Sequence, residues 1–137
     1  MRLVLDTNVW LDLLVFRDAG VALLREREWD LYADERCAEE LERVLGYPFA
    51  AKLVDTAGRV RVMQEFRRRA KLIEAKAAKS LPRCEDADDQ KFLEVALAAG
   101  ALFIVTKDAA LLALDRRRLP FRIVTPAGFV KACNSAL

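Results

Sequence analysis

Short apolar runs alternate along the chain with longer segments of helical periodicity. Four runs have the length of buried strands and are bounded by polar or turn-forming residues: 2–5, 30–33, 102–106 and 121–124. The segments between them carry apolar residues at helical spacing. Strands separated by helices usually pair in parallel. The pattern therefore predicts an α/β fold, a three-layer α/β/α sandwich with a central, mostly parallel sheet.

Capping and breaking residues set the expected limits of the helices. They predict helices over 8–16, 18–28, 34–45, 51–54, 59–79, 86–99 and 109–114, and one that starts at residue 126. Asn8 and Asp34 are the expected N-terminal caps of the first and third helices, and Gly100 should close the helix over 86–99. The long helix over 59–79 should stop before Leu81-Pro82.

Length and hydropathy indicate one ordinary domain. A chain of 137 residues with 54% hydrophobic content can bury a sizeable core, so we expect a single domain over 1–137. The N-terminal apolar run is short and is interrupted by Asp6 and Asp12, unlike a signal peptide. No 18 apolar residues run together, so we expect no membrane segment and a soluble, cytoplasmic protein.

The chain contains no histidine and three widely spaced cysteines, Cys37, Cys84 and Cys133. This composition argues against a zinc site of cysteine and histidine and against a disulfide framework. It excludes Ser-His-Asp and Cys-His catalysis and histidine-based cleavage of RNA within this chain. The groups left for chemistry are carboxylates, lysines, hydroxyls and a bound metal.

Charge is unevenly distributed, although the net charge is only +2. Residues 52–83 hold ten basic and three acidic side chains, a local balance of +7, and the acidic segment Glu85-Asp86-Ala87-Asp88-Asp89 follows directly. A basic surface beside an acidic pocket suits a polyanionic substrate such as a nucleic acid. The alternative is an ordinary solvated helix face.

Two aspartates directly follow predicted strands. Asp6 comes after residues 2–5, and Asp108 comes shortly after 102–106. Ligands bind beyond the carboxyl ends of parallel strands, so both carboxylates are expected in one crevice. Clustered carboxylates repel one another unless a cation lies between them, which favours a divalent-metal site. Alternatively, each aspartate only caps a helix; with Asn8 as the first cap, Asp6 would be free for another role.

Two more acids lie at the edge of predicted buried helix faces. Glu40 borders the stripe formed by Cys37, Leu41 and Val44, so it needs a partner, either an arginine or a metal. Asp89 is in register with the apolar face of the helix over 86–99, whereas Asp88 should point outward. Asp86 is the expected cap of that helix.

These residues lie in segments that match a known family in their order and spacing. The segments are Leu5-Asp6-Thr7-Asn8, Glu40-Leu41-Glu42-Arg43-Val44-Leu45, Asp86-Ala87-Asp88-Asp89-Gln90-Lys91-Phe92-Leu93, Ile104-Val105-Thr106-Lys107-Asp108 with Leu111-Leu112, and Ile123-Val124-Thr125-Pro126 through Phe129. Over nearly its whole length the chain resembles the PIN-domain (PilT N-terminus) nucleases, and among them the toxins of toxin–antitoxin systems.

The resemblance implies a metal-dependent ribonuclease that uses Mg²⁺ or Mn²⁺ and acts on RNA. It assigns the catalytic, metal-binding positions to Asp6, Glu40, Asp89 and Asp108. Supporting roles fall to Thr7, Asn8, Asp86 and Thr106. It also implies an antitoxin partner, and a homodimer is compatible with the Ala/Leu-rich helices. The family usually has proline where Ala87 stands and glycine or asparagine where Lys107 stands, so Lys107 either faces the phosphate or competes with a second metal ion.

Two other interpretations stay open. One is a catalytically inactive PIN-like module that binds RNA or a partner. The other is a phosphoryl-transfer domain of the haloacid dehalogenase or receiver type, although position 8 is Asn rather than the Asp that the former needs. For RNA contact beyond the acids, Trp10, Trp29 and Tyr47 are candidates for stacking on an unpaired base, with burial in the core as the alternative.

Overall fold

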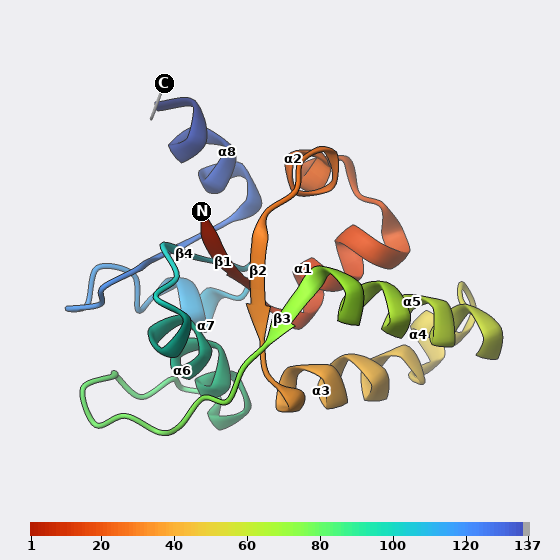
Figure 1. The fold of residues 1–137 in the computed structure, drawn as a ribbon, viewed down its shortest axis with the longest axis horizontal. Coiled ribbons are helices and arrows are strands. Elements are labelled where there is room, and N and C mark those ends of the chain that lie inside the picture. Colours follow the sequence, from red (N-terminus) through yellow and green to blue (C-terminus); the bar gives the residue numbers. More distant parts are fainter. Residues whose placement is uncertain (136–137) are drawn as a thin grey trace.

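A five-stranded, all-parallel sheet forms the centre of the computed structural model, which describes residues 1–135 (Figure 1). The strands are β1 (Arg2–Leu5), β2 (Asp30–Ala33), β3 (Ala70–Leu72), β4 (Phe103–Val105) and β5 (Arg122–Val124), in the order β3-β2-β1-β4-β5. In the centre, Leu3 is paired with Leu31 of β2 and Phe103 of β4. The predicted α/β class with a parallel sheet is confirmed.

The strand order places a switch point beside the central strand. From β1 the chain builds outward to β2 and β3 on one side, then crosses to β4 and β5 on the other. Connections after β1 and β4 therefore leave in opposite directions, which opens a crevice at their carboxyl ends. Asp6 follows β1, and Thr106 to Asp108 follow β4.

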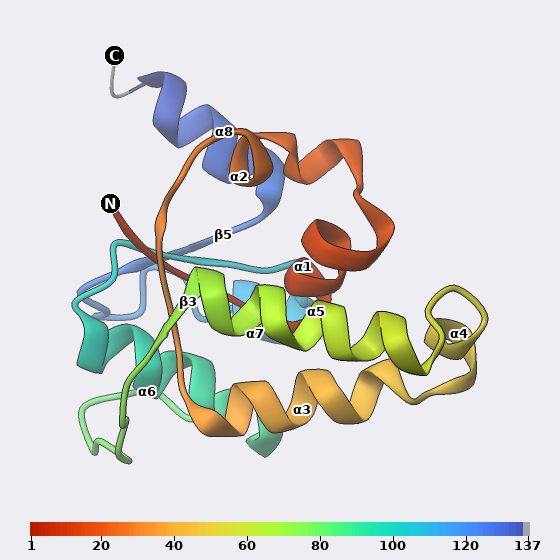
Figure 2. The same cartoon turned by 45° about the vertical axis from the view of Figure 1, so that its right-hand side comes forward.

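Helices pack on both sides of this sheet. They are α1 (Thr7–Leu11), α2 (Ala22–Glu26), α3 (Glu35–Leu45), α4 (Pro48–Ala51), α5 (Thr56–Arg69), α6 (Gln90–Ala99), α7 (Ala109–Leu112) and α8 (Pro126–Ser135). Helix α6 contacts β1, β2 and β4, and α8 contacts β4 and β5 from the opposite side, while α3 and α5 run side by side away from the sheet (Figure 2). Within residues 1–135, no helix is both long and apolar enough to cross a membrane.

The predicted helix over 59–79 is wrong in its second half. Helix α5 ends at Arg69, and residues 70–72 form the edge strand β3, which the sequence analysis missed. Here Ala70 pairs with Leu31, and the N–H of Ile73 donates to the carbonyl of Ala33 at 2.9 Å. Lys71 and Leu72 are both exposed, so this strand lacks the alternating pattern that marks a half-buried strand.

The predicted first cap is also wrong. Asp6, not Asn8, caps α1, because its side chain accepts a hydrogen bond from the N–H of Val9 at 2.9 Å. The α-helix then ends at Leu11 and continues as a π-helix, Asp12–Phe16. This segment winds more widely than an α-helix, a feature often found at functional sites.

Other helix limits are close to their predictions. Asp34 caps α3 through the N–H of Cys37, and Gly100 closes α6 at φ 63°, a left-handed conformation that favours glycine. The helix predicted over 18–28 is instead a 3₁₀ turn (Ala19–Val21) followed by α2, and the one over 51–54 lies three residues earlier as α4.

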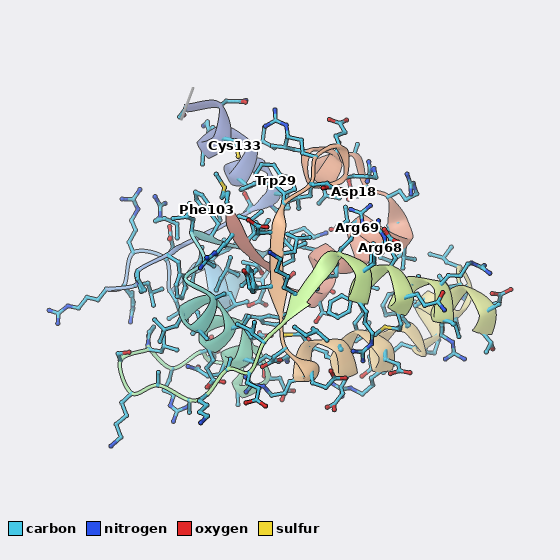
Figure 3. The ribbon with its side chains drawn as sticks, viewed as in Figure 1. Asp18, Trp29, Arg68, Arg69, Phe103 and Cys133 are labelled. Atoms are coloured by element: carbon cyan, nitrogen blue, oxygen red, sulfur yellow. The ribbon has the colours of Figure 1, made fainter. Side chains whose placement is uncertain are left out.

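Aromatic rings join the helices to the core. Trp10 packs edge-on against Phe66 of α5, with ring centroids 4.7 Å apart. Trp29 packs edge-on against Phe129 of α8 at 5.1 Å, and Phe103 lies on the same ring at 5.7 Å (Figure 3). Both tryptophans therefore serve packing, which removes two of the three candidates for base stacking.

A buried ion-pair bridge connects α3 to α6. The guanidinium of Arg36 contacts Asp34 and Glu94, each at 2.7 Å. Both carboxylate side chains are only 6% exposed, whereas that of Arg36 is 46% exposed. Because these two carboxylates share one cation, its loss would leave two nearly buried negative charges without a positive partner.

Replacing Arg36 with methionine keeps the aliphatic packing but removes the cation. We expect Arg36→Met to lower the free energy of unfolding by about 2–3 kcal/mol, because it strands two buried carboxylates. Urea unfolding at pH 7 measures this loss. The control is Arg67→Met, which breaks the exposed Arg67–Glu35 pair and should cost about 0–1 kcal/mol. Equal losses in the two variants would contradict the expectation.

Candidate metal centre

Asp6 is fixed at the carboxyl end of β1 by neighbours on two sides. Its side chain is almost fully buried, with 4% exposure for the residue. One oxygen accepts from the N–H of Val9, and the other accepts from the hydroxyl of Thr106, which follows β4. Burial raises the pKa of Asp6, and the Thr106 hydrogen bond opposes that rise. Thr106 thus ties the central strand to its neighbour at the crevice.

Asp108 lies across the same crevice. The hydroxyl of Thr106 accepts from the N–H of Asp108 at 2.9 Å, and the carboxylate of Asp108 caps α7 by accepting from the N–H of Leu111 at 2.9 Å. The negative charge of Asp108 is one of the causes that raise the pKa of Asp6. Capping uses one oxygen of this carboxylate, so the helix cap does not prevent the second oxygen from binding another ligand.

Asp89 enters the crevice from the start of α6. It ends a 3₁₀ turn (Ala87–Asp89) that Asp86 caps through the N–H of Asp88, and it is half-buried while Asp88 is exposed. Burial, together with the nearby carboxylates of Asp108, Asp86 and Glu40, raises the pKa of Asp89 to about 6. Three acids, from the loop after β4, the turn before α6 and helix α3, thus contribute to the raised pKa of this one carboxyl group.

Glu40 reaches this group from α3 but carries partners of its own. The hydroxyl of Thr7 donates to one of its oxygens, and the ammonium of Lys91 lies 3.4 Å from the other. Lys91 is buried, lies over the ring of Phe92 and also donates to the carbonyl of Asp88. The partners of Glu40 within the protein are therefore a lysine and a hydroxyl. The sequence had suggested either an arginine or a metal ion.

Sequence analysis missed one acid, Asp12. It is buried in the π-helix, and its carboxylate forms an ion pair with the ammonium of Lys107. The same ammonium lowers the pKa of Asp6, so Lys107 lies within electrostatic reach of the crevice. The available signal was a charged residue inside the apolar run Leu11-Asp12-Leu13. Asn8, a predicted supporting residue, is exposed on α1.

The chemistry of these side chains suits a hard divalent cation, which prefers oxygen ligands. Asp6, Asp89 and Asp108 offer carboxylate oxygens, the ligands that Mg²⁺ and Mn²⁺ prefer, and their mutual repulsion is what a cation would relieve. In residues 1–135, however, no three such side chains are close enough together to hold a metal ion as they stand. The crevice gathers the acids loosely, with the ammonium groups of Lys91 and Lys107 at its sides.

This combination of fold and site defines a class: parallel α/β proteins with carboxylates gathered beyond the central strands. The chain belongs to the PIN-domain family, whose model matches residues 2–110. Members of this family are generally metal-dependent nucleases. The matched segment contains Asp6, Glu40, Asp89 and Asp108.

Comparison with solved structures supports the same fold. The crystal structure of PAE2754 from Pyrobaculum aerophilum is similar, with a TM-score of 0.62 at 17% sequence identity, over 100% of this chain and 97% of that chain. At this identity the likeness concerns the fold alone. No curated protein matches the chain in sequence.

The raised pKa of Asp89 predicts how the stability of the folded protein changes with pH. In the unfolded chain Asp89 ionises near pH 4, but in the metal-free folded protein it keeps its proton to about pH 6. The ionisation of Asp89 therefore lowers the free energy of unfolding. This loss begins near pH 4, grows as the pH rises to about 6 and is complete above about pH 6. We expect Asp89→Asn to be more stable than wild type at pH 7 by about 1 kcal/mol, since solvent screens this half-exposed group.

Urea unfolding in EDTA at pH 4, 5, 6 and 7 measures this difference, which should vanish toward pH 4. Asp88→Asn is the matched control: it alters the adjacent, exposed carboxylate and should show no such pH-dependent gain. A variant Asp89→Asn that is less stable than wild type at pH 7 would contradict the electrostatic argument.

Proposed function

We propose that the protein is a Mg²⁺- or Mn²⁺-dependent endoribonuclease that hydrolyses phosphodiester bonds of RNA. The observation that carries the proposal is electrostatic coupling among acids that follow β1 and β4 or lie near them: the charge of Asp108 raises the pKa of Asp6, and the charges of Asp108 and Glu40 help to raise the pKa of Asp89 to about 6. Membership of the PIN-domain family supports it.

Each residue of the crevice has a proposed task. Asp6 is held rigidly by Val9 and Thr106, so it keeps its oxygens in place while Asp89 and Asp108 complete the donor set. When bound, the cation supplies Lewis acidity and a more acidic water. Burial and nearby carboxylates raise the pKa of Asp89 to about 6, which suits it to accept a proton from the attacking water. Lys91 and Lys107 supply positive charge for the substrate phosphate.

A second candidate is a catalytically inactive PIN-like module that binds RNA or a partner. The observation that favours it is the pairing of two site acids with lysines, Glu40 with Lys91 and Asp12 with Lys107. An ammonium already neutralises each of these carboxylates, which weakens their attraction for a divalent cation. Cleavage assays separate the two candidates.

We also propose a biological role as the toxin of a toxin–antitoxin pair, with a protein antitoxin as partner. This proposal rests on the order of the acidic motifs and on the family, and it concerns a cytoplasmic protein that acts on cellular RNA. A homodimer would be compatible with it.

Asp6→Asn is the substitution that tests catalysis. It keeps the size of the side chain and an oxygen for the cap of α1, yet it removes the negative charge. We expect metal-dependent cleavage of a labelled, structured RNA pool to fall about 100-fold or more, because a metal ligand contributes several kcal/mol to the transition state. Gel analysis in Mg²⁺, Mn²⁺ and EDTA measures the rate.

Asp18→Asn is the matched control for the same chemical change. Asp18 caps a 3₁₀ turn on the exposed surface, where its carboxylate accepts from the N–H of Gly20 at 2.8 Å (Figure 3). This variant should cleave at the wild-type rate. Equal cleavage by wild type and Asp6→Asn would indicate a contaminant, and no cleavage by wild type would favour the inactive module.

Growth of a bacterial host tests the toxin role. Induced expression of the wild-type chain should stop colony formation, whereas Asp6→Asn expressed to the same level should not, since toxicity would depend on cleavage. Colony counts with immunoblotted expression levels measure the effect. Normal growth with an active, soluble nuclease would contradict the toxin role and leave the nuclease untouched.

A further inference from the structure

Three aromatic rings gather on the surface at the far end of α3. Phe16 ends the π-helix, Tyr47 is the N-cap residue of α4, and Phe49 lies in the first turn of α4; they are 41%, 45% and 49% exposed. The ring centroid of Phe49 lies 6.5 Å from that of Phe16, nearly parallel to it, and 6.5 Å from that of Tyr47. We call these three residues the aromatic platform. Exposed rings in such a cluster suggest a binding surface.

Cations surround the aromatic platform. Arg17 follows Phe16, Arg43 lies one helical turn before Tyr47, Lys52 follows α4, and the guanidinium of Arg59 lies over Gly46. Within residues 1–135, none of these four forms an ion pair with a carboxylate. Their charge is therefore available to a ligand.

Four cations later in the basic segment are paired instead. Arg67 pairs with Glu35, Arg68 and Arg69 both pair with Glu65, and Lys71 pairs with Asp30. Arg68 and Arg69 lie together at the end of α5 (Figure 3). Within residues 52–71, the cations without a carboxylate partner among the described residues, Lys52, Arg59 and Arg61, therefore all lie in the first half; Lys76, Lys79 and Arg83, beyond β3, form no ion pair with these residues either.

Two elements connect the platform to the acidic crevice. Helix α3 carries Glu40 seven residues before Tyr47, roughly 10 Å along the helix axis. The π-helix that ends at Phe16 begins at Asp12, the partner of Lys107. Arg43 lies between the two ends and lines a surface pocket together with Glu40 and Arg83. A chain that lay on the platform could therefore continue into the crevice.

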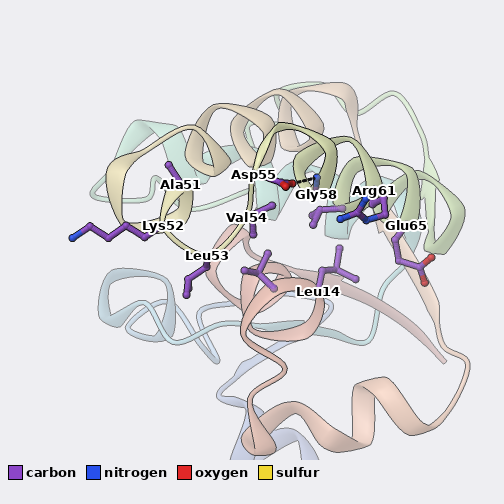
Figure 4. A pocket seen from close by; sticks show the side chains of 11 residues that line it. Leu14, Ala51, Lys52, Leu53, Val54, Asp55, Gly58, Arg61 and Glu65 are labelled. Atoms are coloured by element: carbon purple, nitrogen blue, oxygen red, sulfur yellow. Dashed lines mark hydrogen bonds between the residues drawn. The ribbon is translucent and has the colours of Figure 1, made fainter.

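A second pocket, of about 530 Å³, lies between the π-helix and helices α4 and α5 (Figure 4). Leu14, Leu53 and Val54 line it with apolar surface, and side chains of both charges lie at its sides: Lys52, Arg61, Asp55 and Glu65. Because its charges are mixed, this pocket is not part of the proposed path.

We infer that the aromatic platform, with Arg17, Arg43, Lys52 and Arg59, binds a single-stranded segment of RNA by stacking on its unpaired bases and leads that segment toward the crevice. The inference rests on the proposed ribonuclease function and names the form of its substrate. Bases in a duplex are already stacked on their neighbours and cannot lie on these rings, so the platform selects unpaired RNA.

Charge disfavours a second copy of the chain as the occupant. In a two-fold symmetric contact each platform would face its own copy, which would bring the four cations of one protomer against the same four of the other. Such like-charge contacts oppose association, whereas a phosphate backbone attracts the same groups.

Binding in EDTA tests the inference without cleavage. Fluorescence anisotropy of a labelled, unstructured 12-nucleotide RNA measures affinity for wild type and for the double variant Tyr47→Ser/Phe49→Ser. We expect the variant to bind about tenfold or more weakly, because it loses base stacking, and Tyr47→Trp to bind at least as tightly as wild type. Wild type should bind a duplex of the same length more weakly than the single strand.

Matched controls separate stacking from loss of exposed apolar surface and from net charge. Leu102→Ser changes an exposed apolar residue at the start of β4 and should bind like wild type. Lys52→Gln should flatten the salt dependence of log affinity by about 0.7, the value for one phosphate contact to a single strand, whereas Lys71→Gln, whose cation is paired with Asp30, should not.

The outcomes are distinct from those of the cleavage assay. Binding that depends on the platform supports the inference, even if the wild-type protein does not cleave RNA and the proposed function is wrong. The inference is overturned if the double variant and the wild type bind equally well, or if the wild type does not bind. Neither of these results would contradict the proposed cleavage activity. Light scattering that shows a dimer made monomeric by Tyr47→Ser/Phe49→Ser, with RNA binding unchanged, would overturn it in favour of self-association.

Discussion

The hydroxyl of Thr106 is the contact on which the rest of the site depends. It donates to the carboxylate of Asp6 after β1 and accepts from the backbone N–H of Asp108 after β4, so one side chain joins the segments that carry these two acids. Burial alone would favour protonation of Asp6, and this hydrogen bond opposes that tendency. The position of Thr106 follows in turn from the parallel pairing of Val4 with Ile104. Register in the sheet therefore decides the geometry of the crevice.

Two lysines provide the counterpart to these acids. Lys91 lies against Glu40, and Lys107 lies against Asp12. The charge of Lys107 also lowers the pKa of Asp6, and the charge of Lys91 lowers the pKa of Asp89. In the metal-free protein the two ammonium groups therefore oppose the repulsion among the acids. Under the proposed function, a divalent cation would relieve the repulsion that these lysines leave.

Sequence patterns predicted most of the fold and named acids that follow β1 and β4, and their failures have physical causes. The central strands could be predicted because they are apolar runs, and Asp34 and Gly100 could be predicted as residues that begin and end helices. Strand β3 was missed because Lys71 and Leu72 are exposed at the sheet edge, where pairing with β2 rather than burial decides the structure. Asp12 and the lysine partner of Glu40 were missed because they depend on contacts between distant segments, which no local pattern encodes.

The distribution of charge shows why a local count of basic residues is a weak guide to binding. Residues 52–83 carry an excess of seven positive charges, yet Arg67, Arg68, Arg69 and Lys71 are paired with carboxylates, two of which come from outside that segment. Such pairs hold α5 and β3 to their neighbours and leave little net field. At the start of α5 the cations stand without carboxylate partners among the described residues, beside exposed rings rather than beside acids. Unpaired cations beside exposed rings, rather than the local count of basic residues, therefore support the proposed path of an RNA strand at that end of the molecule.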